Sequence, residues 1–324
     1  MTALHALLLV LVALCASSVH AQSDYPNKPI RIIVPYPPGS GTDFTGREVG
    51  AAFSRALGQP VVIDNRGGAA ATIGHALGAK AAPDGYTLFS LSSAQVLAPH
   101  VRKVINYDPV KDFKPIAMAA TSAYFLAVHP SVPAKNVAEL VALAKAKPGG
   151  MSYASSGAGA GPHLTSSLFL AVAGIDITHV PYRGEGPALQ DVIAGRIDYM
   201  CTTMQSGAAQ ANQGAVKGIA VMAERRAAVV PNIPTTKEQG VDGVEAVVWN
   251  GFLFPKGTPK PIIDKMHQAI ETMMSKPDMV KKLQDAGLEI QPKEQRTPEY
   301  FAKFLKEDVE RWGKVIKAAN ISMD

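Results

Sequence analysis

The sequence of 324 residues has few cysteines, few aromatic residues and no cluster of basic residues. Its two cysteines are Cys15, which lies in an apolar N-terminal run, and Cys201. Once that run is removed, a single cysteine is left and no internal disulfide can form. A chain of this size without a disulfide depends on a large hydrophobic core, which the apolar content of 47% can supply.

Long membrane-spanning runs are also missing. The apolar run from Ala6 to Ala16 is too short to cross a bilayer comfortably. Val19-His20-Ala21 has small residues where a signal peptidase needs them, so we expect residues 1–21 to be a signal peptide and the mature chain to begin at Gln22. A lipid anchor on Cys15 is the second interpretation, although the residue before it is not small. The sequence therefore predicts export without a membrane anchor.

The distribution of charge and the spacing of the histidines and cysteines exclude two further classes of protein, namely nucleic-acid-binding and metal-binding proteins. The formal net charge of +5 is spread along the chain, which does not indicate nucleic-acid binding and mildly favours an anionic ligand. The eight histidines include no pair spaced i, i+4, and Cys201 stands alone. We therefore expect no metal and no cofactor.

A buried strand, a sharp loop and a helix start follow one another early in the chain. Ile32–Val34 is a β-branched run typical of a parallel strand that is covered on both faces. The prolines and glycines of segment 35–41 end the strand, and Ser40, Thr42 and Asp43 are suited to cap the next helix. The free N–H groups and the dipole of such a helix start can bind an anion. An ordinary capped turn is the alternative.

Strands and helices then alternate. The pattern predicts a helix over 44–57, a strand over 60–64, a turn over 65–68, a helix over 69–81 and a strand over 86–91. This alternation indicates a parallel sheet with helices on both faces. The last strand ends in Ser92-Ser93, and ligands of open parallel sheets bind at such carboxyl ends.

The middle third of the chain repeats the opening pattern, which predicts a second lobe built like the first. A strand over 123–129 and a helix over 137–146 come first. A strand over 151–154 then leads into the glycine-rich turn 155–161 and a helix over 162–173. Strands over 177–180 and 197–201 then flank a helix over 187–194. The chain continues with strands over 219–223 and 247–254 and ends in two amphipathic helices, whose apolar stripes we expect in the core.

Three enzyme or cofactor patterns are incomplete. Gly157-x-Gly159-x-Gly161 resembles a dinucleotide fingerprint, but the third glycine of that pattern would stand where the chain has Pro162. Ser40 lacks the flanking glycines of a nucleophile elbow. His163 could serve as a base, but a side chain that packs at a helix start is the favoured interpretation.

With both loops identified, the chain resembles the periplasmic receptors of tripartite tricarboxylate transporters, often called Bug receptors. The resemblance covers the whole predicted mature chain and rests on the order and spacing of several segments. They are Tyr25-Pro26-x-Lys28-Pro29-Ile30, Val34-Pro35-Tyr36-Pro37-Pro38-Gly39, Thr42-Asp43, Leu57-Gly58-Gln59-Pro60-Val61-Val62, Asn65-Arg66, Pro83-Asp84-Gly85-Tyr86-Thr87-Leu88, Tyr153-Ala154-Ser155-Ser156-Gly157, Gly161-Pro162-His163-Leu164, Val180-Pro181-Tyr182-Arg183-Gly184, Trp249-x-Gly251 and Pro255-x-Gly257-Thr258-Pro259.

The resemblance implies an α/β, type II periplasmic binding protein fold. Two α/β lobes, joined by two crossover strands, would close on a small carboxylate, and the loaded receptor would meet a membrane transporter of the tripartite tricarboxylate type. We expect lobe 1 to comprise 22–122 and 230–324, and lobe 2 to comprise 123–229. No nucleic acid is expected as a partner.

The ligand-binding residues that the resemblance implies lie on the carboxyl-end loops of both lobes. From lobe 1 they are Tyr36, Pro38, Gly39, Ser40, Gly41, Thr42, Asp43, Ser92 and Ser93. From lobe 2 they are Ser155, Ser156, Gly157, Ala158, His163, Tyr182, Arg183 and Thr202. We expect backbone N–H groups, hydroxyls and helix starts to neutralise the carboxylate, rather than a buried arginine clamp.

One departure from the family pattern bears on the ligand. Many relatives carry an acid at the position of Thr202, where it would suit a ligand ammonium group. Thr202 removes this charge, which predicts a ligand without an amine, such as a simple or aromatic dicarboxylate; terephthalate is the aromatic example. Two alternatives remain open here, namely a sensor input for the same ligand and a hydrolase or isomerase of organic acids that uses His163 or Asp43.

Overall fold

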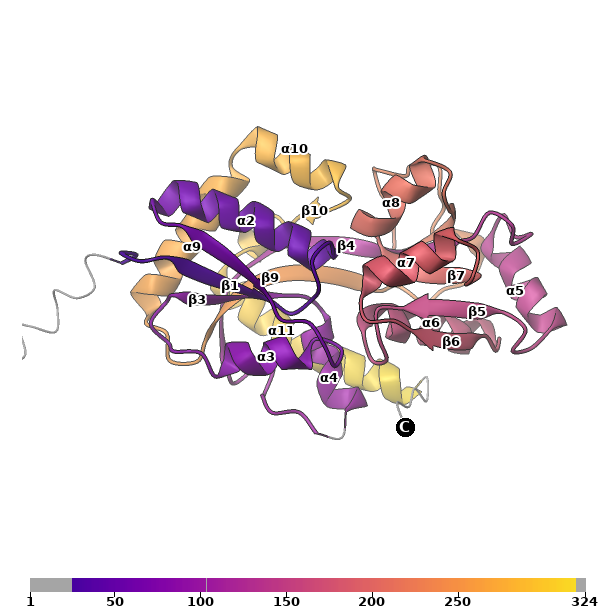
Figure 1. The fold of residues 1–324 in the computed structure, drawn as a ribbon, viewed down its shortest axis with the longest axis horizontal. Helices are drawn as coiled ribbons and strands as arrows, with labels where there is room; N and C mark the ends of the chain where they lie inside the picture. The colour runs from indigo at the N-terminus through magenta and orange to yellow at the C-terminus, as the bar shows by residue number, and fades with distance from the viewer. Residues whose placement is uncertain (1–24, 103, 319–324) are drawn as a thin grey trace, which may run out of the picture.

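The computed structural model describes residues 25–102 and 104–318. The predicted signal peptide 1–21 and its alternative, the lipid anchor on Cys15, lie outside the described residues. Two groups of strands and helices lie side by side along the long axis of the molecule, and two long strands run between them (Figure 1).

The first group contains three parallel strands in the order β2-β1-β3. Its N-terminal elements are β1 (Ile30–Val34), α2 (Gly41–Leu57), β2 (Val61–Asn65), α3 (Thr72–Ala79), β3 (Thr87–Leu91) and α4 (Ala94–Val101). Its C-terminal elements are α9 (Lys260–Met274), α10 (Pro277–Asp285), β10 (Glu289–Ile290), a 3-10 turn η3 (Lys293–Gln295) and α11 (Pro298–Ala318).

The second group repeats this topology with three parallel strands in the order β6-β5-β7. Its elements are α5 (Val137–Ala146), β5 (Ser152–Ser155), α6 (Gly161–Ala173), β6 (Thr178–Pro181), α7 (Glu185–Ile193), β7 (Tyr199–Thr203), α8 (Met204–Asn212), β8 (Lys217–Met222) and the 3-10 turn η2 (Lys237–Gln239). The repeat predicted for the middle third of the chain is therefore present.

Two strands connect the groups. β4 (Phe113–Val128) pairs with β9 (Val247–Pro255) up to Ala123, and from Tyr124 onward it pairs with β7 and β8. The segment that follows the predicted boundary at 230 contacts the second group before β9 begins. The Thr236 N–H donates to Val221 O in β8 at 3.0 Å, and Gln239 accepts from the Val137 N–H at 2.9 Å, so 235–239 contact the second group. The division into lobes at 122/123 and at 229/230 stays a prediction.

The prediction placed the start of the first crossing strand at Ala123, whereas β4 begins at Phe113. Pro115 argues against a strand because it has no N–H to donate to a ladder. In the structure, the register shifts between Pro115 and Ala117 and again between Met118 and Ala120. These irregularities accommodate the proline within a strand of 16 residues.

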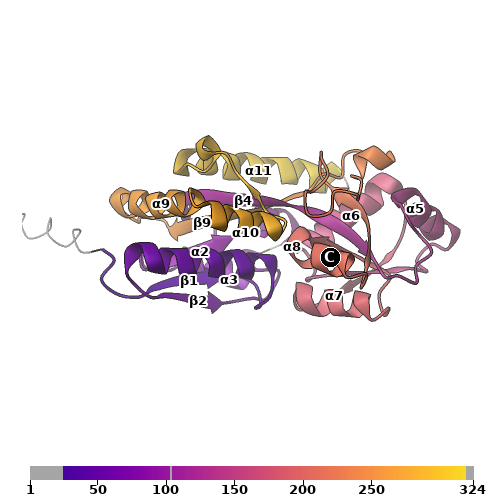
Figure 2. The ribbon, with the colours of Figure 1, turned by 90° about the horizontal axis from the view of Figure 1, so that it is seen from above.

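The core is continuous across the two groups on one side of the sheet. Trp249 in β9 is fully buried and belongs to a cluster that includes Phe89 of the first group and Tyr199 of the second. Its indole N–H donates to Asp308 in α11 at 2.8 Å, and its ring meets Phe301 edge-on. α11 packs on β4 and α4 and reaches α6, so it covers the junction of the groups (Figure 2).

Candidate functional site

A cavity of about 730 Å³ lies between the two groups, a volume typical of a small-molecule site. The lining residues from the first group are Pro35, Tyr36, Pro37, Pro38, Asn65, Gly67, Gly68, Ala69, Ala70, Ala71 and Arg102. Those from the second group are Ser156, Gly157, Ala158, Pro181, Tyr182, Arg183 and Gly184. The two predicted loops thus contribute to one cavity and do not lie on distant surfaces.

The first loop is held by its own polar side chains. Ser40 has extended dihedral angles before α2, and its Oγ accepts from the Asp43 N–H at 3.1 Å, which is the geometry of an N-cap. Asp43 Oδ2 accepts from the Gly39 N–H and from Arg47 Nε, both at 2.9 Å, while Oδ1 accepts from Asn65 at 2.8 Å. Both carboxylate oxygens of Asp43 therefore accept hydrogen bonds, and these bonds tie the loop to α2 and to the end of β2.

Asp43 keeps its negative charge in this setting. Burial raises the pKa of its carboxyl, but the hydrogen bonds from Arg47, Asn65 and the Gly39 N–H lower it, and the net effect is a pKa below the ordinary value. An ionised carboxylate whose two oxygens already accept hydrogen bonds is suited to hold the loop.

The second loop is held by a histidine pair. The imidazole rings of His163 and His179 stack with centroids 4.0 Å apart. His163 Nδ1 accepts from the Gly159 N–H at 3.1 Å, and His179 Nε2 lies 2.7 Å from Ser155 Oγ. The pKa of both imidazoles is lowered to about 4, by burial in each case and, for His163, also by the neighbouring His179 ring. The rings are therefore neutral at pH 7 and position the glycine-rich loop.

Residues of the first group contact residues of the second group directly across the cleft. Arg102 Nη2 donates to Ala158 O at 3.1 Å. A Cβ atom placed on Gly184 would lie 3.1 Å from Pro37 Cγ, and one on Gly41 would lie 3.3 Å from the Gln205 side chain. The structure therefore shows the two groups closed against each other around the cavity.

The predicted site residues fall into two sets. Those that line the cavity are Tyr36, Pro38, Ser156, Gly157, Ala158, Tyr182 and Arg183. Those that are absent from its lining are Gly39, Ser40, Gly41, Thr42, Asp43, Ser92, Ser93, Ser155, His163 and Thr202. Some residues outside the lining hold a lining residue in place. For example, Ser92 Oγ lies 2.9 Å from the hydroxyl of Tyr36.

Sequence reasoning missed two parts of the lining. Asn65 and the segment 67–71 were interpreted as a turn and a helix, yet the segment forms one wall of the cavity. Ala69, Ala70 and Ala71 all have positive φ, an uncommon conformation for alanine that the sequence does not indicate. Arg102, the second omission, lies at the end of α4 and has no local pattern around it.

Arg102 and Arg183 bring positive charge to the cavity. Neither guanidinium forms an ion pair within the described part of the chain. Arg102 Nε is buried and lacks a hydrogen-bond partner there. A free anion is the partner that such groups would accept.

A carboxylate lies beside Thr202, although it belongs to a residue elsewhere in the chain. The side chain of Glu185, at the start of α7, reaches it, and Glu185 Oε1 accepts from the Thr202 hydroxyl and from the Thr203 N–H, both at 2.6 Å. The helix predicted over 187–194 begins earlier, at Glu185. The expectation of a ligand without an amine therefore loses the observation on which it was based.

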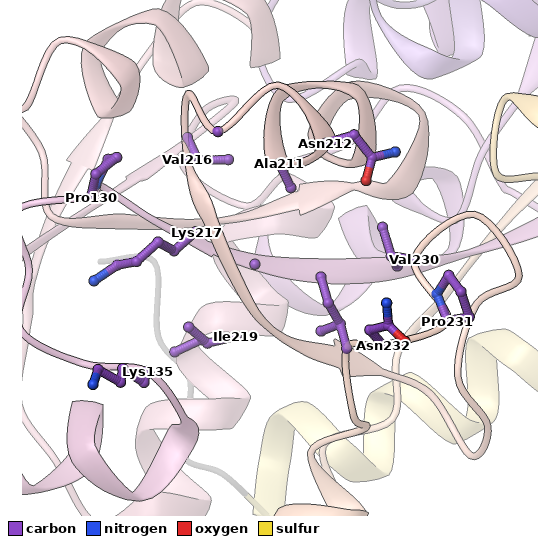
Figure 3. A pocket seen from close by; sticks show the side chains of 13 residues that line it. Pro130, Lys135, Ala211, Asn212, Val216, Lys217, Ile219, Val230, Pro231 and Asn232 are labelled. Atoms are coloured by element: carbon purple, nitrogen blue, oxygen red, sulfur yellow. The ribbon is translucent and has the colours of Figure 1, made fainter.

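A second cavity, of about 460 Å³, lies within the second group (Figure 3). Lys135, Lys217 and Asn212 are among its lining residues, and the Lys217 ammonium donates to the Val132 carbonyl. None of its lining residues belongs to either predicted loop.

Within residues 25–102 and 104–318, no group of acidic, histidine or cysteine side chains could hold a metal ion. The helices in these ranges are all too short or too polar to cross a bilayer.

Comparison with known proteins agrees with this architecture. Residues 45–321 match the family described as "Tripartite tricarboxylate transporter family receptor". A Pseudomonas sp. (strain P51) protein, the "UPF0065 protein in tcbD-tcbE intergenic region", is 34% identical over 310 residues, which are 95% of this chain and 91% of that protein.

Solved structures are similar over nearly the whole chain. Periplasmic binding protein BugD has a TM-score of 0.87 at 30% identity and covers 92% of this chain and 99% of its own. "R. palustris Rpa4515 with adipate" has a TM-score of 0.88 at 30% identity, with coverages of 92% and 99%. MatC from Rhodopseudomonas palustris, with bound malate, has a TM-score of 0.86 at 31% identity, with coverages of 90% and 100%.

These proteins are receptors and not enzymes, and they share the two-lobe α/β fold seen here. The family match covers the glycine-rich loop of the second group and extends through α11, whereas the whole Pro35–Asp43 segment precedes it. The chain belongs to the tripartite tricarboxylate transporter family of receptors.

Proposed function

We propose that this receptor binds a small organic acid with at least one carboxylate, and preferably two, in the cavity between its lobes. In the proposed complex, the ligand is held in the periplasm and delivered to a membrane transporter of the tripartite tricarboxylate type. Two similar receptors were solved with adipate and with malate, both dicarboxylates. Terephthalate is an aromatic dicarboxylate and belongs among the candidates.

The observation that carries the proposal is that two guanidinium groups, neither of which forms an ion pair within the described residues, lie at a cavity between two polar loops. Removing a carboxylate from water is costly unless charged or N–H donors replace the lost hydrogen bonds. Arg102 and Arg183 offer charged donors, and Ser156 with the N–H groups of the glycine-rich loop offers neutral ones. Because the donors come from both lobes, the closed form should bind the ligand much more tightly than an open form would.

Calorimetric titration with a panel of acids tests the proposal. The panel should include succinate, malate, adipate, aspartate, glutamate and terephthalate, with uncharged diamides of the same length as controls. We expect at least one acid to bind, no diamide to bind, and the acid to be recovered unchanged. Lack of binding to every acid, with the protein shown to be folded, would contradict the proposal.

Ser156→Trp provides a matched structural test. Ser156 lines the cavity and is partly exposed there, so an indole at this position would fill the space without replacing a core residue. We expect loss of acid binding with an unchanged melting temperature. Ser131→Trp, on the exposed surface of the second group, is the control and should bind normally. Tight binding by Ser156→Trp would show that the ligand sits elsewhere.

A further inference from the structure

The second cavity, shown in Figure 3, is built from four stretches of chain that lie apart in the sequence. They are the loop at 130–135, the end of α8 with the turn at 211–214, the start of β8 at 216–219 and the segment 230–233. A volume of about 460 Å³ is within the usual range for a small-molecule site. The two cavities share no lining residue, so the second one is a separate candidate site.

The charged residues of its lining are both cations. Lys135 and Lys217 line the cavity, and none of the other lining residues is acidic. Neither ammonium group forms an ion pair within residues 25–102 and 104–318. The acid nearest to Lys135 in the sequence, Glu139, is engaged at the start of α5, where its carboxylate accepts from the Lys135 backbone N–H at 2.7 Å and from Asn136 Nδ2 at 3.0 Å. The cavity therefore carries two positive charges that the described chain does not neutralise.

Lys217 is held in place at one end of the cavity. It is partly buried, and its ammonium group donates a hydrogen bond to the Val132 carbonyl. The same carbonyl accepts from the Ala134 N–H at 2.8 Å, so the loop that carries Lys135 is joined to this point. Figure 3 shows both lysine side chains at the same end of the cavity. An ammonium group has three N–H donors and this bond uses one, so the others are available to an anion.

The remainder of the lining is mainly apolar. Ile219 and Val230 are almost fully buried residues that border the cavity, and Ile233 lies beside them. A Cβ atom on Gly218 would lie 2.6 Å from Ile233 Cδ1, so this wall of the cavity is set by close packing against β8. An apolar group that enters such a cavity gains free energy by leaving water. The site is therefore suited to an anion with an apolar body.

These two features together favour a small acid with one carboxylate. An aspartate or glutamate side chain of a partner protein would supply the carboxylate, but it has too little apolar surface to cover the wall formed by Ile219, Val230 and Ile233. The lining has no cation besides the two lysines at one end, so a dicarboxylate would lack a partner for its second charge. Taking that charge out of water without a partner is costly.

We propose that the second cavity binds a monocarboxylic acid with a compact apolar body, either aromatic or branched aliphatic. In this complex the carboxylate lies between the ammonium groups of Lys135 and Lys217, and the apolar body packs on Ile219, Val230 and Ile233. The site is additional to the one between the lobes, and the inference does not rest on the proposed function.

An NMR titration of the Ser156→Trp variant with benzoate tests this inference, because the indole fills the cavity between the lobes and leaves the second cavity free. We expect saturable shifts of backbone amide signals within 216–219 and 230–233. Benzamide has nearly the same shape without the charge, and it should bind on the order of tenfold or more weakly. The absence of saturable shifts in these two segments, or equal binding of benzamide, would overturn the inference.

Lysine variants in the same background test the assigned contact. Lys135→Met should weaken benzoate binding on the order of tenfold, and it should fold normally because Lys135 is exposed. Lys145→Met replaces an exposed lysine of α5 outside the lining, so it is the matched control and should bind benzoate like Ser156→Trp alone. Unchanged benzoate binding by Lys135→Met would refute the site. Succinate, malate and adipate titrated into the unaltered protein test the cavity between the lobes separately, so the two proposals can fail independently.

Discussion

At the scale of single residues, the neutral state of His163 and His179 links the glycine-rich loop to pH. Both imidazoles have a pKa of about 4 in the folded chain, against an ordinary value of 6.5. The unfolded chain therefore takes up protons between pH 6.5 and 4 that the folded chain does not. The resulting stability is fully present above pH 6.5 and is lost as the pH falls through this window.

We therefore predict that the free energy of unfolding falls by roughly 3 kcal/mol between pH 6.5 and pH 4.5 through these two groups, with about 2 kcal/mol from His163 and about 1 kcal/mol from the partly exposed His179, whose share is reduced by solvent screening. Urea titration at both pH values would measure it. The double variant His163→Gln, His179→Gln should show a smaller pH dependence than the unaltered protein. An equal pH dependence in both proteins would show that other groups cause it.

Residue-scale contacts are also where sequence reasoning reached its limit. The capping role of Ser40 could be predicted, because the cap and its partner lie three residues apart. Glu185 and Thr202 are 17 residues apart and meet only because α7 packs beside β7. Arg102 reaches Ala158 from 56 residues away. Contacts set by packing between elements leave no local pattern in the sequence.

At the scale of elements, the start of α6 is fitted closely to β4. A Cβ atom on Gly161 would lie 1.8 Å from the hydroxyl oxygen of Tyr124 and 3.0 Å from the ring carbon that bears it. α6 carries His163 in its first turn, so the close approach of α6 and β4 also places the histidine that supports the glycine-rich loop.

We predict that Gly161→Ala destabilises the protein by about 1–3 kcal/mol, the usual range for overpacking a core site. Tyr124→Phe removes the clashing oxygen. Gly161→Ala should therefore cost less stability in the Tyr124→Phe background than in the unaltered protein. Thermal or urea denaturation of the three variants measures the coupling. Additive effects of the two substitutions would contradict the assigned contact.

The elements themselves differ in how far the sequence predicts them. The helix over 137–146 has the predicted bounds, because its apolar pattern is strong and Asn136 caps it. The early half of β4 was missed because Pro115 weighs against a strand unless its bulges are known. α8 and α10 were missed altogether. No local signal for them was identified from the sequence, although α10 starts with Pro277 and has Asp278 in its first turn, which are both typical of a helix start.

At the scale of the whole molecule, Arg102 links the lobes. Its hydrogen bond to Ala158 O joins the end of α4 to the glycine-rich loop of the other group. Because this bond exists only when the lobes are together, it stabilises the closed form. The same guanidinium faces the cavity, so loss of the side chain removes both a closing contact and an anion partner.

Arg102→Met should therefore weaken acid binding by on the order of tenfold or more, chiefly through faster dissociation. Surface plasmon resonance or stopped-flow fluorescence would separate the two rate constants. Arg55→Met, on the exposed side of α2, is the control and should bind like the unaltered protein. An unchanged dissociation rate in Arg102→Met would contradict the linking role.

The measurement that tests the central claim most directly is a crystal structure with the tightest-binding acid of the panel. The account predicts one carboxylate of this acid in the cavity between the lobes, within hydrogen-bond distance of Arg102 from the first group and of donors in the Ser155–Gly159 loop of the second group. An acid bound only in the cavity of Figure 3, or held by one lobe only with the cleft empty, would contradict it.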